Sequence, residues 1–300
     1  MDIKLLEHIG KSLYKTNILK EYKRYVVFMV RCRMHSKHIE ELQGFFETND
    51  LRKAMLHCTP SFLEQTTRAF FYKKSNWNER KNLVRNHIEI LEEKFSEDFV
   101  RKLYVDGSRI RVWEDLHQEK PLGMDLWFHA GQRKEGCLSL VLNYEGEELY
   151  QIMFWLNRDI EGRLALYIGA LQGPQNGSEI IKELTKAFFG YRTKNLIFYG
   201  IRNVAKVIGV ERIYAVANEG YYAMNHIRRD RKLKTDFGEF WQECEGVVSA
   251  DKRFYVIPVE EARKPLEEIA SKKRAQYRRR FAKLDEIDAS VDSILSSYKK

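Results

Sequence analysis

A polar turn in the middle of the chain carries residues suited to binding an anion. The turn, Gln172-Gly-Pro-Gln-Asn-Gly-Ser178, follows the almost continuous apolar run Leu164–Leu171 and precedes apolar residues at helical spacing from Ile181 to Phe188. This order predicts a buried strand, a turn and a helix. The backbone N–H groups of such a turn, together with the positive end of the helix dipole, attract phosphate groups. We expect the phosphates of a ligand to be held by Gln172, Gly173, Asn176, Gly177 and Ser178.

Three residues further along could orient a substrate or move a proton. A second helical pattern ends at Gly209, and the strand-like run Glu211–Ala217 then returns the chain to the sheet. Asn218, at the end of this run, could orient an acceptor group or a water molecule. The phenol of Tyr221 could donate a proton. His226 could accept one, because the arginines that follow it lower the pKa of its imidazole.

If the reaction is acyl transfer, as a resemblance given below implies, these residue types have roles in it. An acyltransferase aligns an acceptor amine or hydroxyl with a thioester carbonyl, removes a proton and stabilises the developing oxyanion. Asn218, Tyr221 and His226 are therefore our candidate catalytic residues. Each also has a simpler structural explanation: an asparagine that bonds its own loop, a tyrosine that covers the core, and a solvated histidine.

A separate group of residues has the spacing of metal ligands. His35, His38 and Glu41 lie three residues apart, so they would share one face of a helix. A complete site would need a ligand from a second helix, for which His87 is a candidate. A metal-dependent enzyme that tailors a peptide is thus an alternative function. Our main hypothesis assigns no metal ligand.

Residues 1–105 are predicted to form a helical N-terminal region. The clearest amphipathic run is Trp77–Phe99, in which apolar residues recur every three or four positions. We expect the helices to pack on one another and on the sheet that follows. One face of an earlier helix carries Ile18, Tyr22, Tyr25 and Val26.

Residues 106–262 have the pattern of a mixed sheet with flanking helices. An antiparallel meander precedes the central strand, and a short helix and a last strand follow the polar loop. The segments of the meander are Arg109–Trp113, Asp125–His129, Cys137–Leu142 and Glu148–Leu156. Residues 263–300 are predicted to be a basic C-terminal helix that begins at about Leu266. The expected fold class is therefore α+β.

Composition indicates a globular protein without a membrane span. The chain has 300 residues, of which 44% are hydrophobic, and this is enough for a packed core. No run approaches the roughly 18–20 apolar residues that cross a bilayer, and residues 1–24 lack the apolar stretch of a cleaved signal. Four scattered cysteines without a C-x-x-C pair indicate neither a zinc cluster nor a disulfide framework. We expect a cytoplasmic location.

The net charge of +9 is unevenly distributed. Basic residues crowd into Arg228–Lys234 and Lys272–Arg280. Such runs favour phosphate-bearing or other anionic partners, although they fit a solvated surface equally well. A non-enzymatic protein that binds an anionic surface or a partner through Lys272–Lys283 is a further alternative.

Several blocks between about residues 20 and 286 resemble the VirK/YbjX family of Gram-negative bacteria, the domain-of-unknown-function family 535. The blocks are Pro60–Leu63, Trp77–Arg80 with His87, Leu171–Pro174, Ala217–Asn218, Phe240–Trp241, and the most specific one, Ser271–Phe281 with Leu284–Asp285. The family commonly has a histidine shortly after the central asparagine, where this chain has Tyr221 and Tyr222. It also has a Gly-Gly pair where this chain has Glu245-Gly246. The resemblance implies a role in bacterial virulence and in the resistance of bacteria to antimicrobial peptides. It does not imply a particular chemical reaction.

The predicted order of elements is similar to that of the GNAT acyltransferases. In that fold the turn after the fourth strand holds the pyrophosphate of an acyl-coenzyme A through backbone N–H groups. The usual turn reads Gln/Arg-x-x-Gly-x-Gly/Ala, and Gln172–Gly177 fits it imperfectly because Pro174 has no N–H to donate. The resemblance implies an acyltransferase that uses acyl-CoA or another acyl donor and modifies a peptide or a cell-envelope component.

Overall fold

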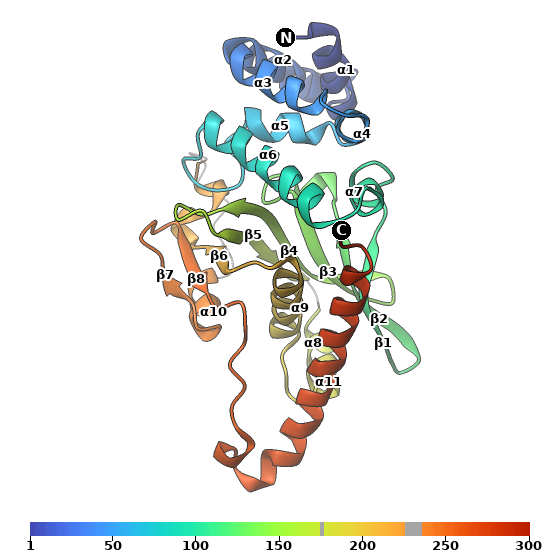
Figure 1. The fold of residues 1–300 in the computed structure, drawn as a ribbon, viewed down its shortest axis with the longest axis vertical. Helices are drawn as coiled ribbons and strands as arrows, with labels where there is room; N and C mark the ends of the chain where they lie inside the picture. The colour runs from blue at the N-terminus through green and yellow to red at the C-terminus, as the bar shows by residue number, and fades with distance from the viewer. Residues whose placement is uncertain (175–176, 226–235) are drawn as a thin grey trace.

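The computed structural model describes residues 1–174, 177–225 and 236–300, and these residues form an α+β fold. A group of N-terminal helices lies on one side of a mixed sheet, and a long C-terminal helix lies on the other side (Figure 1). The predicted fold class is therefore confirmed, with its helical N-terminal region, mixed sheet, flanking helices and C-terminal helix.

The N-terminal region consists of seven helices within the described residues. They are α1 (Ile3–Leu13), α2 (Leu19–Met34), α3 (Ser36–Phe46), α4 (Asp50–Cys58), α5 (Ser61–Thr67), α6 (Trp77–Lys94) and α7 (Glu97–Tyr104). Helix α6 begins with a capping box, in which Asn76 and Glu79 each accept a hydrogen bond from the other's backbone N–H. It packs on the sheet, where the backbone N–H of Leu156 donates to Nδ1 of His87 at 3.0 Å.

The described strands form one eight-stranded sheet in the order β1-β2-β3-β4-β5-β6-β8-β7. Their bounds are β1 Ile110–His117, β2 Lys120–Trp127, β3 Leu138–Tyr144, β4 Glu147–Arg158, β5 Leu164–Gln172, β6 Arg212–Val216, β7 Val247–Val248 and β8 Phe254–Ile257. The described neighbours pair antiparallel except β5 and β6, which are parallel. This parallel pair requires a crossover, and α8 (Ser178–Ala187) and α9 (Thr193–Ile208) provide it.

The sheet is covered on both faces, which explains why its central strands are apolar along their length. Helix α6 packs on β4 from one side and α9 packs from the other (Figure 1). Residues 151–156 of β4 are all buried. On α9, an added Cβ at Gly200 would lie 2.4 Å from Sδ of Met124, so the helix lies very close to β2.

The final helix, α11 (Ser271–Ser296), begins later than predicted, because residues 266–268 form a short 3₁₀ turn after Pro265. Its C-terminal half carries a buried stripe of Leu284, Ile287, Val291 and Leu295. Tyr199 on α9 donates a hydrogen bond to Asp288 at 2.8 Å. The helix is thus anchored to the domain by one face.

The apolar face that the sequence indicates for α2 is only partly the face by which this helix packs on its neighbours. Its inner face is buried through Phe28 and Cys32. Ile18, Tyr22 and Val26 are instead exposed to solvent. Among the described residues, no helix is long and apolar enough to cross a membrane.

Candidate functional site

Of the two parallel strands, β6 ends earlier than β5. Pairing of β5 with β6 runs from Ala165 opposite Arg212 to Ile168 opposite Ala215. Strand β5 then continues to Gln172, paired only with β4. Strand β6 ends at Val216, so the edge of β5 beyond Ile168 has no β6 partner where β5 leads into the predicted anion-binding turn, and we call this unpaired edge the gap.

A loop from another part of the sheet lies against the face of β5 beside this gap. An added Cβ at Gly169, the first residue of β5 beyond the parallel pairing, would lie 1.9 Å from the backbone oxygen of Glu135. No side chain fits at this distance, so the glycine makes the close approach possible. The loop is held by Gln65, which donates to the carbonyls of Gly136 at 2.8 Å and Arg133 at 2.9 Å. Glu135 is thereby fixed beside the gap.

The carboxyl group of Glu135 is buried, with 4% of the residue exposed. Tyr221 donates a hydrogen bond to it at 3.1 Å, and Tyr222 forms a second one. Burial raises the pKa of Glu135 to about 7, while these hydrogen bonds and nearby Lys134 act in the opposite direction. A carboxyl group with a pKa near neutrality can both accept and donate a proton, which is the property expected of a general acid–base.

Tyr221 is held in place by contacts on both sides. Its backbone forms an isolated β-bridge with Tyr72, and the N–H of Lys73 donates to the carbonyl of Gly220 at 2.7 Å. Burial and the nearby Glu135 carboxyl raise the pKa of its phenol well above the usual range. The phenol therefore stays protonated at physiological pH and can act as a hydrogen-bond donor.

Asn218 lies at the end of β6 but does not point freely into the gap. Its Nδ2 donates to the carboxylate of Asp236 at 2.8 Å, and its Oδ1 accepts from the N–H of Phe237 at 2.9 Å. Asp236 in turn caps α10 (Phe237–Glu243). Asn218 thus attaches the start of α10 to the end of β6. The other predicted catalytic residue, His226, lies outside the described residues.

The predicted phosphate turn lies between β5 and α8. Gln172 and Gly173 are exposed, and an added Cβ at Gly173 would lie 2.7 Å from the ring of Tyr150. Gly177 is the N-cap of α8 and provides no side-chain cap, and Ser178 begins the helix. Asn176 lies outside the described residues. Gln172 follows Gly169 by three residues, which is ~10 Å along a strand.

His87 is not available to complete the metal site predicted on the N-terminal helices. Nε2 of His87 lies 2.7 Å from the Tyr104 hydroxyl, and Nδ1 accepts the hydrogen bond from Leu156. Both ring nitrogens are thus engaged inside the core. His35 stacks on Trp77 with the ring centres 3.9 Å apart. The described residues contain no group of three or more His, Cys, Asp or Glu side chains arranged to hold a metal.

Sequence reasoning missed Glu135. The residue stands in a short polar connection between two strands, and nothing in its neighbourhood distinguishes it from the other acidic residues. Its importance comes from contacts with residues far away in the sequence, above all Gly169 and Tyr221. Five hollows on the described surface, of about 120 to 770 Å³, border neither Glu135 nor the turn. With 4% of the residue exposed, the carboxyl group is shielded from solvent by its surroundings.

Known proteins resemble this chain over most of its length. The family model "Protein of unknown function (DUF535)" matches residues 17–293. The uncharacterized protein YbjX of Escherichia coli (strain K12) is 34% identical over 214 residues, which are 69% of this chain and 64% of that protein. The chain thus spans less than two thirds of YbjX.

Two further relatives are more distant. An uncharacterized protein of Haemophilus influenzae is 25% identical over 270 residues, 87% of each chain. The protein of Mannheimia haemolytica named membrane protein LapB is 22% identical over 219 residues, 69% of this chain and 89% of that protein. No solved structure matches. The family match over residues 17–293 shows that this chain belongs to the DUF535 family of proteins of unknown function.

Proposed function

We propose that this chain is a GNAT-like acyltransferase in which Glu135 and Tyr221 move the proton during transfer. The observation that carries the proposal is the buried Glu135 carboxyl, with a pKa of about 7, bonded to Tyr221 beside the gap. Of the predicted catalytic residues, Tyr221 keeps its proposed role. Asn218 becomes a positioning residue that fixes the neighbouring helix.

The chemistry follows from the two protonation states. The ionised Glu135 carboxylate accepts the proton of the acceptor amine or hydroxyl as the acceptor attacks the thioester carbonyl. The new bond to the acyl carbon forms and the C–S bond breaks. Tyr221 gives its proton to the leaving thiolate in the same step in which it takes one from Glu135 through the 3.1 Å hydrogen bond, so no free phenolate forms, as the raised pKa of the phenol requires. The proton taken from the acceptor is thus replaced by one delivered to the thiol. Glu135 ends as a carboxylate and Tyr221 as a protonated phenol, as at the start.

The acyl donor of the proposal is acyl-CoA or a similar phosphate-bearing thioester. Its phosphates would lie against the backbone of Gly173 and Gly177 and the first turn of α8, which has no side-chain cap. Pro174 supplies no N–H, so the turn offers one donor fewer than the usual GNAT turn. Glycine at both positions allows tight packing of the turn, because an added Cβ would lie 2.7 Å from the Tyr150 ring at Gly173 and 2.5 Å from the Pro174 ring at Gly177.

The acceptor of the proposal is a peptide or a cell-envelope component in a bacterial virulence or peptide-resistance setting. The support is the resemblance to the VirK/YbjX family, and one relative is named a membrane protein. Because Glu135 is 4% exposed, the acceptor must displace part of the covering segments before it reaches the carboxyl group. The reaction is proposed to take place in the cytoplasm.

Calorimetric titration with coenzyme A tests the donor site, and it does not require knowledge of the acceptor. We expect binding by the wild type, loss of binding in Gly177→Glu, and unchanged binding in Glu135→Gln. The last variant separates donor binding from proton transfer. No binding by the folded wild type, or full binding by Gly177→Glu, would overturn the proposal.

A second candidate function is binding of an anionic partner by α11. Lys272, Lys273, Arg278 and Arg279 are exposed. Other cations of the same helix are engaged within the chain: Lys283 pairs with Asp115 at 2.8 Å, and Arg280 donates to the carbonyl of Phe189 at 2.7 Å. Charge reversal at Arg278 and Arg279 would abolish salt-dependent binding to an anionic partner if α11 has this role.

A further inference from the structure

Helix α2 exposes an apolar strip on the outermost surface of the N-terminal region. Tyr22, Val26, Val30 and Met34 follow one another at intervals of four residues, so they lie along one face. Their exposed fractions are 48%, 40%, 51% and 72%. Leu19 and Val27 beside them are 70% and 46% exposed. A contiguous apolar face of this kind marks a surface that binds a partner.

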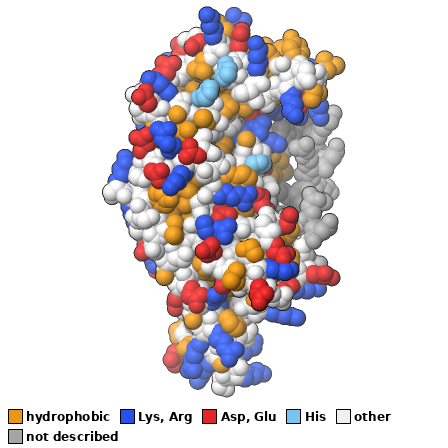
Figure 2. Space-filling view, turned by 90° about the vertical axis from the view of Figure 1, so that its right-hand side faces the viewer, with side chains coloured by type: hydrophobic (Ala, Val, Ile, Leu, Met, Phe, Trp, Pro, Cys, Tyr) orange, Lys and Arg blue, Asp and Glu red, His pale blue; other side chains and the backbone are white. Residues whose placement is uncertain are grey.

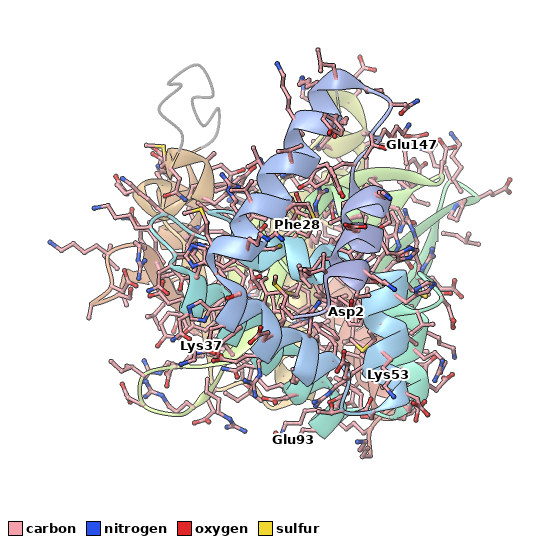
Figure 3. The ribbon with its side chains drawn as sticks, turned by 90° about the horizontal axis from the view of Figure 1, so that it is seen from above. Asp2, Phe28, Lys37, Lys53, Glu93 and Glu147 are labelled. Carbon is pink, nitrogen blue, oxygen red and sulfur yellow. The ribbon has the colours of Figure 1, made fainter. Side chains whose placement is uncertain are left out.

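The strip lies at one end of the molecule, where it is free to meet a flat surface. Helices α1, α2 and α3 form the end opposite the start of α11 (Figure 1). Seen from above, α2 lies uppermost, with Phe28 labelled on it (Figure 3). A side view shows apolar and basic side chains together at this end (Figure 2). A groove of about 290 Å³ between α1 and α2 extends the apolar surface through Ile3 and Met29.

Basic residues accompany the strip. Lys20, Lys23 and Arg33 are exposed, and within the described residues none of them has an ion-pair partner. The one acidic residue of α2, Glu21, pairs with Arg24 at 2.5 Å. The exposed face of the helix is thus apolar with a surplus of positive charge.

A hollow beside the strip concentrates this charge. It has a volume of about 250 Å³, and its lining includes Lys23, Arg24, Arg31 and Arg68. Glu21 pairs with Arg24, and the buried carboxylate of Glu64 lies 3.5 Å from Arg68 but also pairs with Arg133, so the two acidic residues offset only part of the charge. Burial, with Arg68 nearby, lowers the pKa of Arg31. An anionic group in the hollow would relieve this repulsion.

We propose that α2 lies flat on an anionic lipid bilayer, with its apolar strip among the acyl chains and a lipid phosphate in the basic hollow. An apolar face flanked by Lys and Arg is what an interfacial helix presents to such a surface. Lys23 lines the hollow and is also exposed beside the strip, so its stem can lie along the apolar surface while its ammonium group reaches the headgroups. This inference stands independently of the acyltransferase proposal, because it uses none of the residues of that site.

Co-sedimentation of the full chain with vesicles tests the proposal. We expect binding to phosphatidylcholine vesicles in which about a third of the lipid is phosphatidylglycerol, and little binding to phosphatidylcholine alone. Val26→Glu with Val30→Glu should weaken binding about tenfold or more, since two charges would enter the apolar region. Lys20→Glu with Lys23→Glu should weaken it by a similar factor, and added salt should weaken wild-type binding.

A control is Ile160→Glu, which changes an exposed apolar residue outside α2 and should leave vesicle binding unchanged. In Tyr22→Trp, the indole emission should shift to the blue on addition of the anionic vesicles, and this reads out insertion without disrupting the strip. Absence of wild-type binding would overturn the proposal, as would equal binding by the Val26/Val30 variant. A concentration-dependent dimer that this variant dissociates, without vesicle binding, would assign the strip to contact between two copies. Coenzyme A binding should be unchanged in all these variants.

Discussion

Two regions of this protein reverse the usual placement of residue types. At the gap between β5 and β6, the carboxyl group of Glu135 is buried against backbone and tyrosines. On α2, valines, a methionine and a tyrosine face solvent beside cations. Burial of a carboxyl group and exposure of an apolar strip each oppose stability. We infer from this comparison that both regions are candidates for a role other than stabilising the fold.

The two regions differ in how tightly they are built. Glu135 is fixed by hydrogen bonds to its loop, by Tyr221, and by the absence of a side chain at Gly169. The side chains on the outer face of α2, by contrast, are largely exposed to solvent in the part of the chain that the structure describes. Substitutions in the first region should therefore change stability and pKa values, whereas substitutions in the second should change binding alone.

Gly169→Ala should have the largest effect on stability. The new Cβ would lie 1.9 Å from the backbone oxygen of Glu135, so the loop or the strand must move. We expect a loss of about 3 kcal/mol in the free energy of unfolding, measured by urea denaturation. Gly44→Ala on α3 is the control, because no atom lies within 4 Å of the added group. Equal stability of the Gly169 variant and the wild type would show that the backbone of Glu135 does not lie against Gly169 in solution.

The pH dependence of stability should reveal the Glu135 carboxyl directly. Its pKa is about 7 in the folded chain and 4.5 as a free group, so the folded state holds the proton more tightly. Its contribution to stability is therefore fully present below pH 4.5 and is lost as the pH rises through 7. The difference corresponds to about 3 kcal/mol. Glu135→Gln should lack this loss, so the wild type should fall relative to the variant between these pH values.

Parallel stability curves of wild type and Glu135→Gln over that range would contradict a raised pKa. The comparison isolates Glu135, because the other carboxyl groups titrate in both proteins. It also separates the carboxyl group from the loop that carries it, since glutamine keeps nearly the same volume and can accept the hydrogen bond from Tyr221.

Tyr221→Phe should have a smaller effect. It removes the hydrogen bond to Glu135, which holds the pKa of that carboxyl down, so the pKa of Glu135 should rise further. Loss of one hydrogen bond costs about 1 kcal/mol. Following the Glu135 carboxyl signal by NMR during a pH titration measures the shift. An unchanged titration curve would mean that the two groups do not interact in solution.

The strand, the turn and α8 could be predicted because their signals are local. The apolar run Leu164–Leu171, the small polar residues after it and the helical spacing beyond are all contained in one short stretch. The hairpin between β1 and β2 was harder to place. Its turn residues, Gln118 and Glu119, both have positive φ, although neither is the glycine or asparagine that usually indicates such a turn.

The candidate site could be predicted only in part. Tyr221 was among the predicted residues because it comes shortly after the end of a predicted strand, and the end of a strand can be recognised from the sequence. Glu135 was not, because its burial depends on three segments that meet only in the folded chain: Gln65 on α5, Gly169 on β5 and Tyr221 after β6. Periodicity likewise identified the apolar face of α2 but could not show whether another element covers it.

Val30→Glu should have the smallest effect on stability. Val30 is 51% exposed, so its replacement should change the free energy of unfolding by less than about 0.5 kcal/mol. Phe28, two residues earlier on the inner face, is 2% exposed, and its truncation serves as the positive control in the same urea titration. A marked loss of stability in Val30→Glu would mean that the strip is covered in solution by another part of the chain or by a second copy. Unchanged stability together with lost vesicle binding would instead assign the apolar strip to the membrane surface. Val30 would then contribute to binding and not to folding, in contrast to the buried Phe28 on the same helix.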